Sequence, residues 1–219
     1  MIISDHKVDL YINSDPTEKL PLIIVNTDSD DDLYKEITDI TAKPFHLAQV
    51  HVNDWNGELS PWYGEAVFGK NDFKGKANLY LKQLEEEINP EILKQINNEV
   101  CYIAVAGYSL AGLFALYSVY KTDLFEKAVS ASGSLWYPDF LEYVTDHKMS
   151  DSIKQIYLSL GDKEKYAKNE LMSKVEDNTL FIYEHLRKET DVYFEFNEGN
   201  HFKDPDKRLA KGIAYILNS

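Results

Sequence analysis

The sequence has little cysteine, little arginine and no long apolar run, and each shortage excludes a class of protein. Cys101 is the single cysteine, so no intramolecular disulfide can form, and its place in an apolar strand predicts a buried structural thiol. Only Arg187 and Arg208 are arginines, which leaves no arginine cluster for a phosphate-rich ligand. No stretch approaches about 18 apolar residues, and residues 1–6 lack the pattern of a signal peptide. We therefore expect a soluble cytoplasmic protein that does not bind membranes.

The overall charge is strongly negative. A formal charge of −14 at pH 7 argues against binding to nucleic acid or to anionic membranes, because both repel an acidic surface. Hydrophobic residues make up 44% of the chain, so a sizeable core can form. With 219 residues and no linker-like segment, we expect one domain that spans residues 1–219.

Strand-like and helix-like segments alternate along the chain. Apolar runs predict strands at 7–12, 20–27, 45–52, 100–106, 127–132, 153–160 and 192–196. Apolar residues at helical spacing predict helices at 33–40, 77–96, 110–120, 175–186 and 209–217, the second of them with a pause at Asn89 and Pro90. Repeating strand–helix units with unbroken apolar strands imply an α/β fold, with a mostly parallel central sheet and helices on both faces.

The segment from residue 100 to 112 is an apolar strand that ends in Gly-Tyr-Ser and passes at once into an apolar helix. This is the sequence form of a nucleophile elbow, a sharp turn that holds a serine hydroxyl above the N-terminus of a helix. The turn needs small neighbours, and Gly107, Ala111 and Gly112 supply them. Ser109 is therefore the candidate nucleophile.

A nucleophilic serine needs a base, and a carboxylate that orients the base. In this kind of fold the acid and then the histidine follow the serine along the chain, at carboxyl ends of strands. His185 lies inside a predicted helix, whereas His201 follows the last predicted strand, so we choose His201 as the base. Asp162 and Glu164 both follow the strand at 153–160, and the residues alone leave the choice between them open.

Four sequence blocks carry a resemblance to a known family. They are Gly-Tyr-Ser-Leu-Ala-Gly at 107–112, Ser-Gly-Ser-Leu-Trp at 132–136, Leu-Gly-Asp-Lys-Glu at 160–164 and Gly-Asn-His at 199–201. From about residue 20 onward the chain resembles the putative esterase family of α/β hydrolases, which includes enterochelin-esterase-like proteins, feruloyl esterases and S-formylglutathione hydrolase. The resemblance implies the α/β-hydrolase fold, and the length leaves room for little or no cap domain.

The resemblance also bears on the acid and on the elbow. In the family the acid commonly stands three residues after the glycine that closes its strand, which is the position of Glu164; Asp162 stays the alternative. The sequence departs from the family at two positions. Tyr108 stands where many members have histidine, and Ala111 stands where most have glycine.

The oxyanion hole of such a site uses the backbone N–H of the residue after the nucleophile, here Leu110, and a second donor from the loop after the third strand. Counting strands places that loop at 27–30, where we choose the N–H of Asp28. Carboxylates there would oppose an oxyanion unless they turn away or cap the following helix. The aspartates of 28–32 also have the spacing of a calcium loop, but Leu33 stands where that loop needs glycine, which favours helix capping. No metal or organic cofactor is implied.

Three tryptophans follow the carboxyl ends of predicted strands. We expect Trp55, Trp62 and Trp136 to line the acyl or leaving-group pocket, although packing in the core or at its rim explains each of them as well. An open site without a large cap suits a bulky, planar or polymer-linked ester.

These observations predict a serine esterase that works through an acyl-enzyme on Ser109, with His201 as the base and Glu164 as the acid. One alternative is the same site acting as a thioesterase or acyltransferase. The other is a non-catalytic binding protein that keeps the α/β-hydrolase fold, since fold does not fix function. The identity of the ester and the oligomeric state, a homodimer included, stay open.

Overall fold

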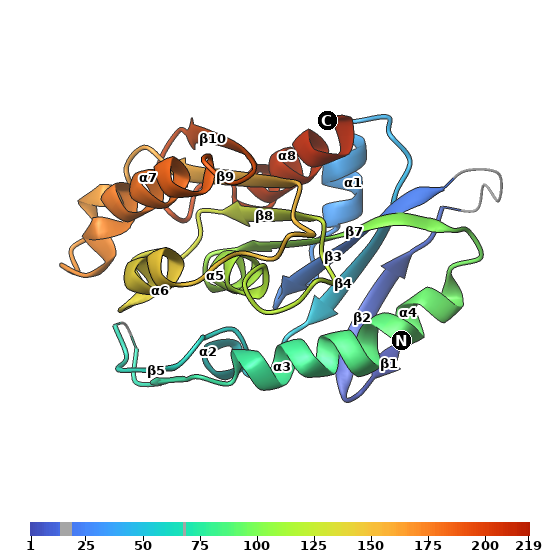
Figure 1. Cartoon of the computed structure of the whole chain (residues 1–219), viewed down its shortest axis with the longest axis horizontal. Helices are drawn as coiled ribbons and strands as arrows, with labels where there is room; N and C mark the ends of the chain where they lie inside the picture. Colours follow the sequence, from blue (N-terminus) through green and yellow to red (C-terminus); the bar gives the residue numbers. More distant parts are fainter. Residues whose placement is uncertain (14–18, 68) are drawn as a thin grey trace.

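The computed structural model describes residues 1–13, 19–67 and 69–219, and an eight-stranded sheet lies at the centre of this part of the chain (Figure 1). From edge to edge the strands are β1 (Ile2–Ile3), β2 (His6–Tyr11), β4 (His46–His51), β3 (Leu20–Thr27), β7 (Val100–Tyr108), β8 (Lys127–Ala131), β9 (Gln155–Gly161) and β10 (Asp191–Asn197). In this sheet β4, β3, β7, β8, β9 and β10 pair in parallel, whereas β2 runs antiparallel to both of its neighbours. The predicted mostly parallel sheet is therefore confirmed.

Helices cover both faces of the sheet (Figure 1). On one face α1 (Leu33–Thr38) and α8 (Pro205–Asn218) lie side by side. The other face carries α3 (Ala77–Gln83), α4 (Asn89–Gln95), α5 (Leu110–Ser118), α6 (Phe140–Asp146) and α7 (Val175–Leu186). Because both faces are covered, β3 is buried from Leu20 to Asn26, which explains the apolar run over its first six residues. No helix in the described ranges has the length and apolar content that crossing a membrane requires.

The carboxyl ends of the parallel strands meet at one edge of the sheet. Ser109 follows β7, Glu164 follows β9 and His201 follows β10, so three segments far apart in sequence arrive at this edge. Asn26 near the end of β3 pairs in register with Gly107 of β7, which places the loop after β3 beside the serine turn. Ligand sites of open α/β sheets form at such an edge.

Several short elements were not expected from the sequence. Between β4 and α3 the chain forms α2 (Trp55–Glu58) and a hairpin of β5 (Tyr63–Gly64) and β6 (Phe73–Lys74). After β9 come two 3₁₀ turns, η2 (Glu164–Tyr166) and η3 (Met172–Lys174). Elements of two to four residues are too short to show a hydrophobic period, so sequence patterns do not reveal them.

The predicted pause at Asn89 and Pro90 does not occur. Helix α3 continues through a π-helical turn, η1 (Leu84–Ile88), directly into α4. Proline lacks an N–H, and its ring crowds the carbonyl four residues earlier in a regular helix. In the wider turn the Asn89 N–H bonds to the carbonyl of Leu84, five residues back, and we attribute the continuity of the helix to this local widening.

Two expectations about burial were wrong. Cys101 is exposed rather than buried, because β8 pairs with β7 only from Ala104 onward, so that the first residues of β7 extend beyond this neighbour. Ile40 does not continue the apolar face of α1. The helix ends at Thr38, and Ile40 is 50% exposed.

Helix α5 is buried at every position, so we expect its side chains to dominate stability. Replacing the fully buried Phe114 with alanine is expected to lower the free energy of unfolding by about 3–5 kcal/mol, because the change removes apolar contacts and leaves a cavity. Phe181 of α7 is 49% exposed, and Phe181→Ala serves as the matched control, with a loss below about 1 kcal/mol. Urea unfolding followed by circular dichroism measures both, and equal losses would contradict the prediction.

Candidate active site

Ser109 sits on a sharp turn between β7 and α5. Its backbone has φ 58° and ψ −122°, a conformation that a residue with a side chain rarely adopts. Gly107 makes the turn possible, because a Cβ there would lie 2.4 Å from the carbonyl oxygen of Ala111. The Ser109 N–H donates to the carbonyl of Ala131 at 3.2 Å, which ties the turn to β8. The turn has the strain and the tight packing of a nucleophile elbow.

His201 lies in the loop after β10 and contacts Ser109 across 92 residues of sequence. Its Nε2 is 3.0 Å from Ser109 Oγ, and its Nδ1 is 2.7 Å from Glu164 Oε2. An ionised carboxylate only accepts, so Nδ1 carries the proton and Nε2 accepts from the serine hydroxyl. Ser134 Oγ lies 3.5 Å from Ser109 Oγ as a second polar neighbour.

The structure places Glu164, and not Asp162, at His201. The Glu164 side chain is 4% exposed, and its Oε1 accepts the Gly161 N–H at 2.7 Å. Asp162 is exposed, and its Oδ1 accepts the Gly199 N–H at 2.7 Å, so it holds the loop that leads to His201. At Gly161 a Cβ would lie 2.4 Å from the Gly199 carbonyl oxygen, and a side chain there would push the two loops apart.

The carboxyl of Glu164 is held ionised although it is buried. Burial raises its pKa, but hydrogen bonds from His201, Ser132 and the Gly161 N–H, together with the charge of the imidazole, outweigh burial and hold the pKa of Glu164 below its usual range. An ionised Glu164 keeps the proton of His201 on Nδ1 and leaves Nε2 free to accept one.

Two residues beside this group were missed as site residues. The Tyr108 hydroxyl donates to the carbonyl of His201 at 2.6 Å, and burial raises its pKa, which keeps it protonated. Arg208 is 3% exposed, and one of its guanidinium nitrogens lies 3.3 Å from Glu164 Oε1. The position of Arg208 in the sequence was a signal that could have found it. Arg208 stands next to Leu209 and one helical turn before Gly212, within the apolar stripe of the last helix, where an arginine needs a partner.

A cavity of about 320 Å³ opens at Ser109 and His201, and Asp28 and Trp55 are among its lining residues. The other two tryptophans are not brought to it. Trp62 donates from Nε1 to the carbonyl of Pro138 at 3.1 Å and packs edge-on against aromatic rings. Trp136 is 4% exposed and packs near Phe73, with ring centroids 6.2 Å apart.

The acidic loop after β3 directs two of its carboxylates away from the serine. Asp32 caps α1, accepting the Lys35 N–H at 3.1 Å, and Asp30 pairs with Lys7 at 2.5 Å. Helix capping is therefore confirmed for Asp32. The side chains of Asp9, Asp30 and His51 also lie close enough together to hold a metal ion. The Lys7 ammonium, however, contacts both aspartates and already balances part of their negative charge.

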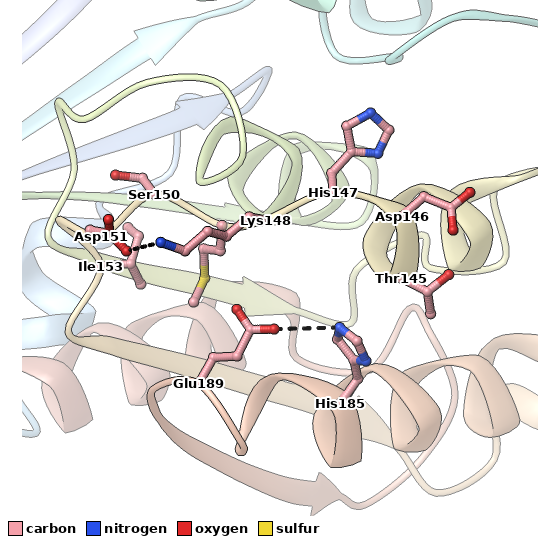
Figure 2. Close-up of a pocket in the computed structure, with 10 residues that line it drawn as sticks. Thr145, Asp146, His147, Lys148, Ser150, Asp151, Ile153, His185 and Glu189 are labelled. Atoms are coloured by element: carbon pink, nitrogen blue, oxygen red, sulfur yellow. Dashed lines mark hydrogen bonds and ion pairs between the residues drawn. The ribbon is translucent and has the colours of Figure 1, made fainter.

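A larger cavity, of about 600 Å³, lies at the opposite edge of the sheet, where α7 ends and β9 begins (Figure 2). Figure 2 shows two contacts between its side chains: Lys148 with Asp151 at 2.6 Å, and His185 with Glu189 at 3.7 Å. His147 is turned away from these pairs and stacks on Tyr143. Among the described lining residues, none repeats the contact of a serine with a histidine that is seen at Ser109 and His201.

A sequence model of the family described as Putative esterase matches residues 26–204. The chain belongs to this family. Over 156 residues it is 31% identical to ferri-bacillibactin esterase BesA of Bacillus subtilis (strain 168), an alignment that covers 66% of this chain and 53% of that protein. The chain thus spans about half the length of this curated relative.

Solved structures share the fold of this family member. The IroE-like serine hydrolase of Shewanella oneidensis superposes with a TM-score of 0.78 at 18% identity, covering 97% of this chain and 76% of that one. Siderophore hydrolase EstB of Aspergillus nidulans gives a TM-score of 0.76 at 14% identity, with 99% and 92% covered. The predicted α/β-hydrolase fold is confirmed, and the family is the one described as Putative esterase.

Replacing Glu164 by glutamine is expected to lower the free energy of unfolding at pH 7 by about 3 kcal/mol, because the buried Arg208 then loses its carboxylate. The ionised carboxylate, whose pKa is lowered, stabilises the fold above the ordinary carboxyl pKa, and this stabilisation is lost as pH falls through the lowered one. The gap between wild type and variant in urea unfolding should therefore narrow below about pH 4. The exposed Glu142→Gln is the control, and a constant gap down to about pH 3 would contradict the prediction.

Proposed function

We propose that this protein is a serine esterase that hydrolyses a carboxylic ester through an acyl-enzyme on Ser109. The observation that carries the proposal is the continuous chain of contacts from Ser109 Oγ through both nitrogens of His201 to Glu164, at 3.0 and 2.7 Å. A serine at positive φ on a strand–helix turn, with its hydroxyl on a histidine that is itself oriented by a carboxylate, is arranged for nucleophilic catalysis.

The reaction proceeds in two halves. Ser109 Oγ bonds to the ester carbonyl carbon while His201 Nε2 takes its proton, and the tetrahedral intermediate collapses as His201 returns that proton to the leaving alcohol. In the second half His201 takes a proton from water, which attacks the acyl-enzyme carbonyl carbon. The second tetrahedral intermediate collapses as His201 returns that proton to Ser109 Oγ, which releases the carboxylic acid product and the free serine. Glu164 keeps the imidazole in the tautomer that both halves need.

The developing oxyanion needs N–H donors. Leu110 is the first residue of α5, where backbone N–H groups have no partner within the helix and the dipole favours negative charge. Asp28 lines the same cavity as Ser109, which supports its N–H as the second donor. The carboxylates of Asp30 and Asp32 are occupied by Lys7 and by α1, so they oppose the oxyanion less than the sequence suggests.

The charge of the cavity bears on the substrate. In the described part of the chain, its acidic lining residues are Asp28, Asp31 and Asp206, and no lysine or arginine lines it. Burial and the neighbouring Asp31 raise the pKa of Asp206. Coulomb repulsion therefore favours uncharged esters over anionic ones. A siderophore ester is the second candidate, because relatives named above are siderophore hydrolases, and the same charge condition applies to it.

Ser109→Ala and His201→Ala are each expected to lower kcat for p-nitrophenyl acetate by about 10⁴-fold or more, because the nucleophile or its base is lost. A fluorophosphonate probe should label the wild type on Ser109, located by mass spectrometry. Turnover that survives Ser109→Ala, or a wild type that neither turns over nor takes the label, would sink the proposal and favour a binding protein.

Glu164→Gln is expected to lower kcat/KM by about 10³-fold, because the imidazole loses the acceptor that fixes its tautomer. Asp162→Asn is the matched control at the same strand end, with an expected loss below about tenfold, since Asp162 only ties down the Gly199 loop. Esterase assays on both variants measure this. Equal losses would contradict the assignment of Glu164 as the acid.

The acidic lining predicts that p-nitrophenyl acetate is turned over faster than the monoanionic p-nitrophenyl hemisuccinate, by about fivefold to tenfold in kcat/KM. The ratio should grow as pH rises through the raised pKa of Asp206, because that carboxyl then becomes charged. Asp206→Asn should reduce the ratio without changing acetate turnover by more than about twofold. A ratio that is independent of both pH and Asp206 would exclude this basis for selectivity.

A further inference from the structure

We propose that Arg208 is a positioning residue for catalysis, which keeps the Glu164 carboxylate charged and aimed at His201. The inference rests on the catalytic roles proposed above for Glu164 and His201. It goes beyond them because Arg208 touches neither the serine nor the cavity, and so would act only through the acid.

Arg208 lies in the first turns of α8, on the face of the helix that packs against the sheet. One guanidinium nitrogen lies 3.3 Å from Glu164 Oε1 and donates to Ser132 Oγ at 3.2 Å and to the Tyr108 hydroxyl at 3.3 Å. The other nitrogen donates to the carbonyl of Glu198 at 2.9 Å. The guanidinium thus contacts the ends of three neighbouring strands and the loop that leads to the histidine.

The burial of this pair is the first argument. Among the aspartate, glutamate, lysine and arginine side chains of the described ranges, Glu164 and Arg208 are the two that are buried, and they contact each other. A buried charge is costly unless a partner of opposite sign and hydrogen bonds compensate it. Arg208 supplies both to Glu164, so the acid can stay ionised away from water.

The division of the two carboxylate oxygens is the second argument. Oε2 is the acceptor for His201 Nδ1, whereas Oε1 is held by the Gly161 N–H at 2.7 Å and by Arg208. With one oxygen fixed from two directions, the carboxylate cannot rotate away from the imidazole. A guanidinium suits this role because its planar fork presents several donors in fixed directions.

The loop of His201 is the third argument. Arg208 holds the Glu198 carbonyl three residues before the histidine, and Tyr108, which accepts from Arg208, donates to the carbonyl of His201 itself. Arg208 therefore constrains both the acid and the backbone that carries the base.

A pH–rate profile separates positioning from structural support. The charged or titratable groups that face Glu164 are His201 from the β10 loop, Arg208 from α8 and Tyr108 from β7. His201 must be unprotonated at Nε2 to accept the proton of Ser109, and replacing Arg208 removes one positive charge from its surroundings. Without that positive charge the protonated imidazole is more stable, so the acid limb of kcat/KM moves to higher pH.

The experiment measures kcat, KM and the pH profile with p-nitrophenyl acetate for wild type, Arg208→Gln, Arg208→Lys and Arg187→Gln. Arg187, the other arginine of the chain, is exposed at the end of α7, where it pairs with Glu184, and serves as the control. We expect Arg208→Gln to lower kcat about 100-fold with KM within about threefold, and to move the acid limb up by about one pH unit. Arg208→Lys should keep the limb in place and recover about tenfold in kcat, and Arg187→Gln should match wild type.

A double-mutant cycle tests the route through the acid. In a Glu164→Gln background, adding Arg208→Gln should cost less than about threefold, because the group it acts on is already gone. An acid limb that Arg208→Gln leaves unmoved, or a full 100-fold loss repeated in the Glu164→Gln background, would overturn the inference and leave Arg208 a structural residue. If Arg208→Gln does not fold, Arg208→Lys decides. Wild-type kcat, or a loss of kcat repeated in full in the Glu164→Gln background, would overturn the inference, and a loss of about tenfold that disappears in that background would support it. An inactive, unlabelled wild type would instead overturn the proposed function.

Discussion

The site depends on a backbone conformation that Ser109 would not adopt alone. A positive φ at a serine costs about 1–3 kcal/mol, and it persists only where the surroundings determine the turn completely. Here β7 is paired on both sides, by β3 and β8, and α5 is buried at every position, so neither arm of the turn can move. The hydroxyl is consequently fixed in space by the core of the protein.

Everything else at the catalytic edge is arranged around that fixed point. The histidine and the acid arrive on loops, which are the more mobile parts of a fold. Those loops are tied to one another. Asp162 accepts the Gly199 N–H, and Gly161 lets the two backbones approach. The buried ion pair of Glu164 with Arg208 adds a contact to α8. The rigid serine turn and the linked loops of Glu164 and His201 together hold the three side chains in fixed positions.

Much of this could be read from the sequence, for a physical reason. At Ser109 three independent signals coincide: an apolar run, small residues at the turn and a helical period after it. The long central strands were equally clear, because burial on both faces favours apolar residues at successive positions, as at 22–25 of β3. The residues alone could not choose between Asp162 and Glu164, since the choice depends on the 3₁₀ turn η2, which directs one carboxylate inward.

Other features lay beyond sequence patterns because they depend on how neighbours are arranged in space. The exposure of Cys101 follows from where β8 begins to pair, and the separate place of Trp62 and Trp136 follows from packing in an aromatic cluster. Arg208 was hidden for the same reason. A single charge in an apolar stripe carries no sign of its partner, which lies 44 residues away in sequence.

The order of the strands in the sheet follows the order in which the ribosome makes them from β7 onward. From β7 to β10 each new strand joins the outer edge of the sheet made so far, so the sheet can grow as the nascent chain emerges. Glu164 is made well before the helix that carries its counter-ion, and until α8 docks, the acid has no guanidinium to be buried against. A chain cut short before α8 would therefore retain Ser109 but lack the positive charge that Glu164 is buried against.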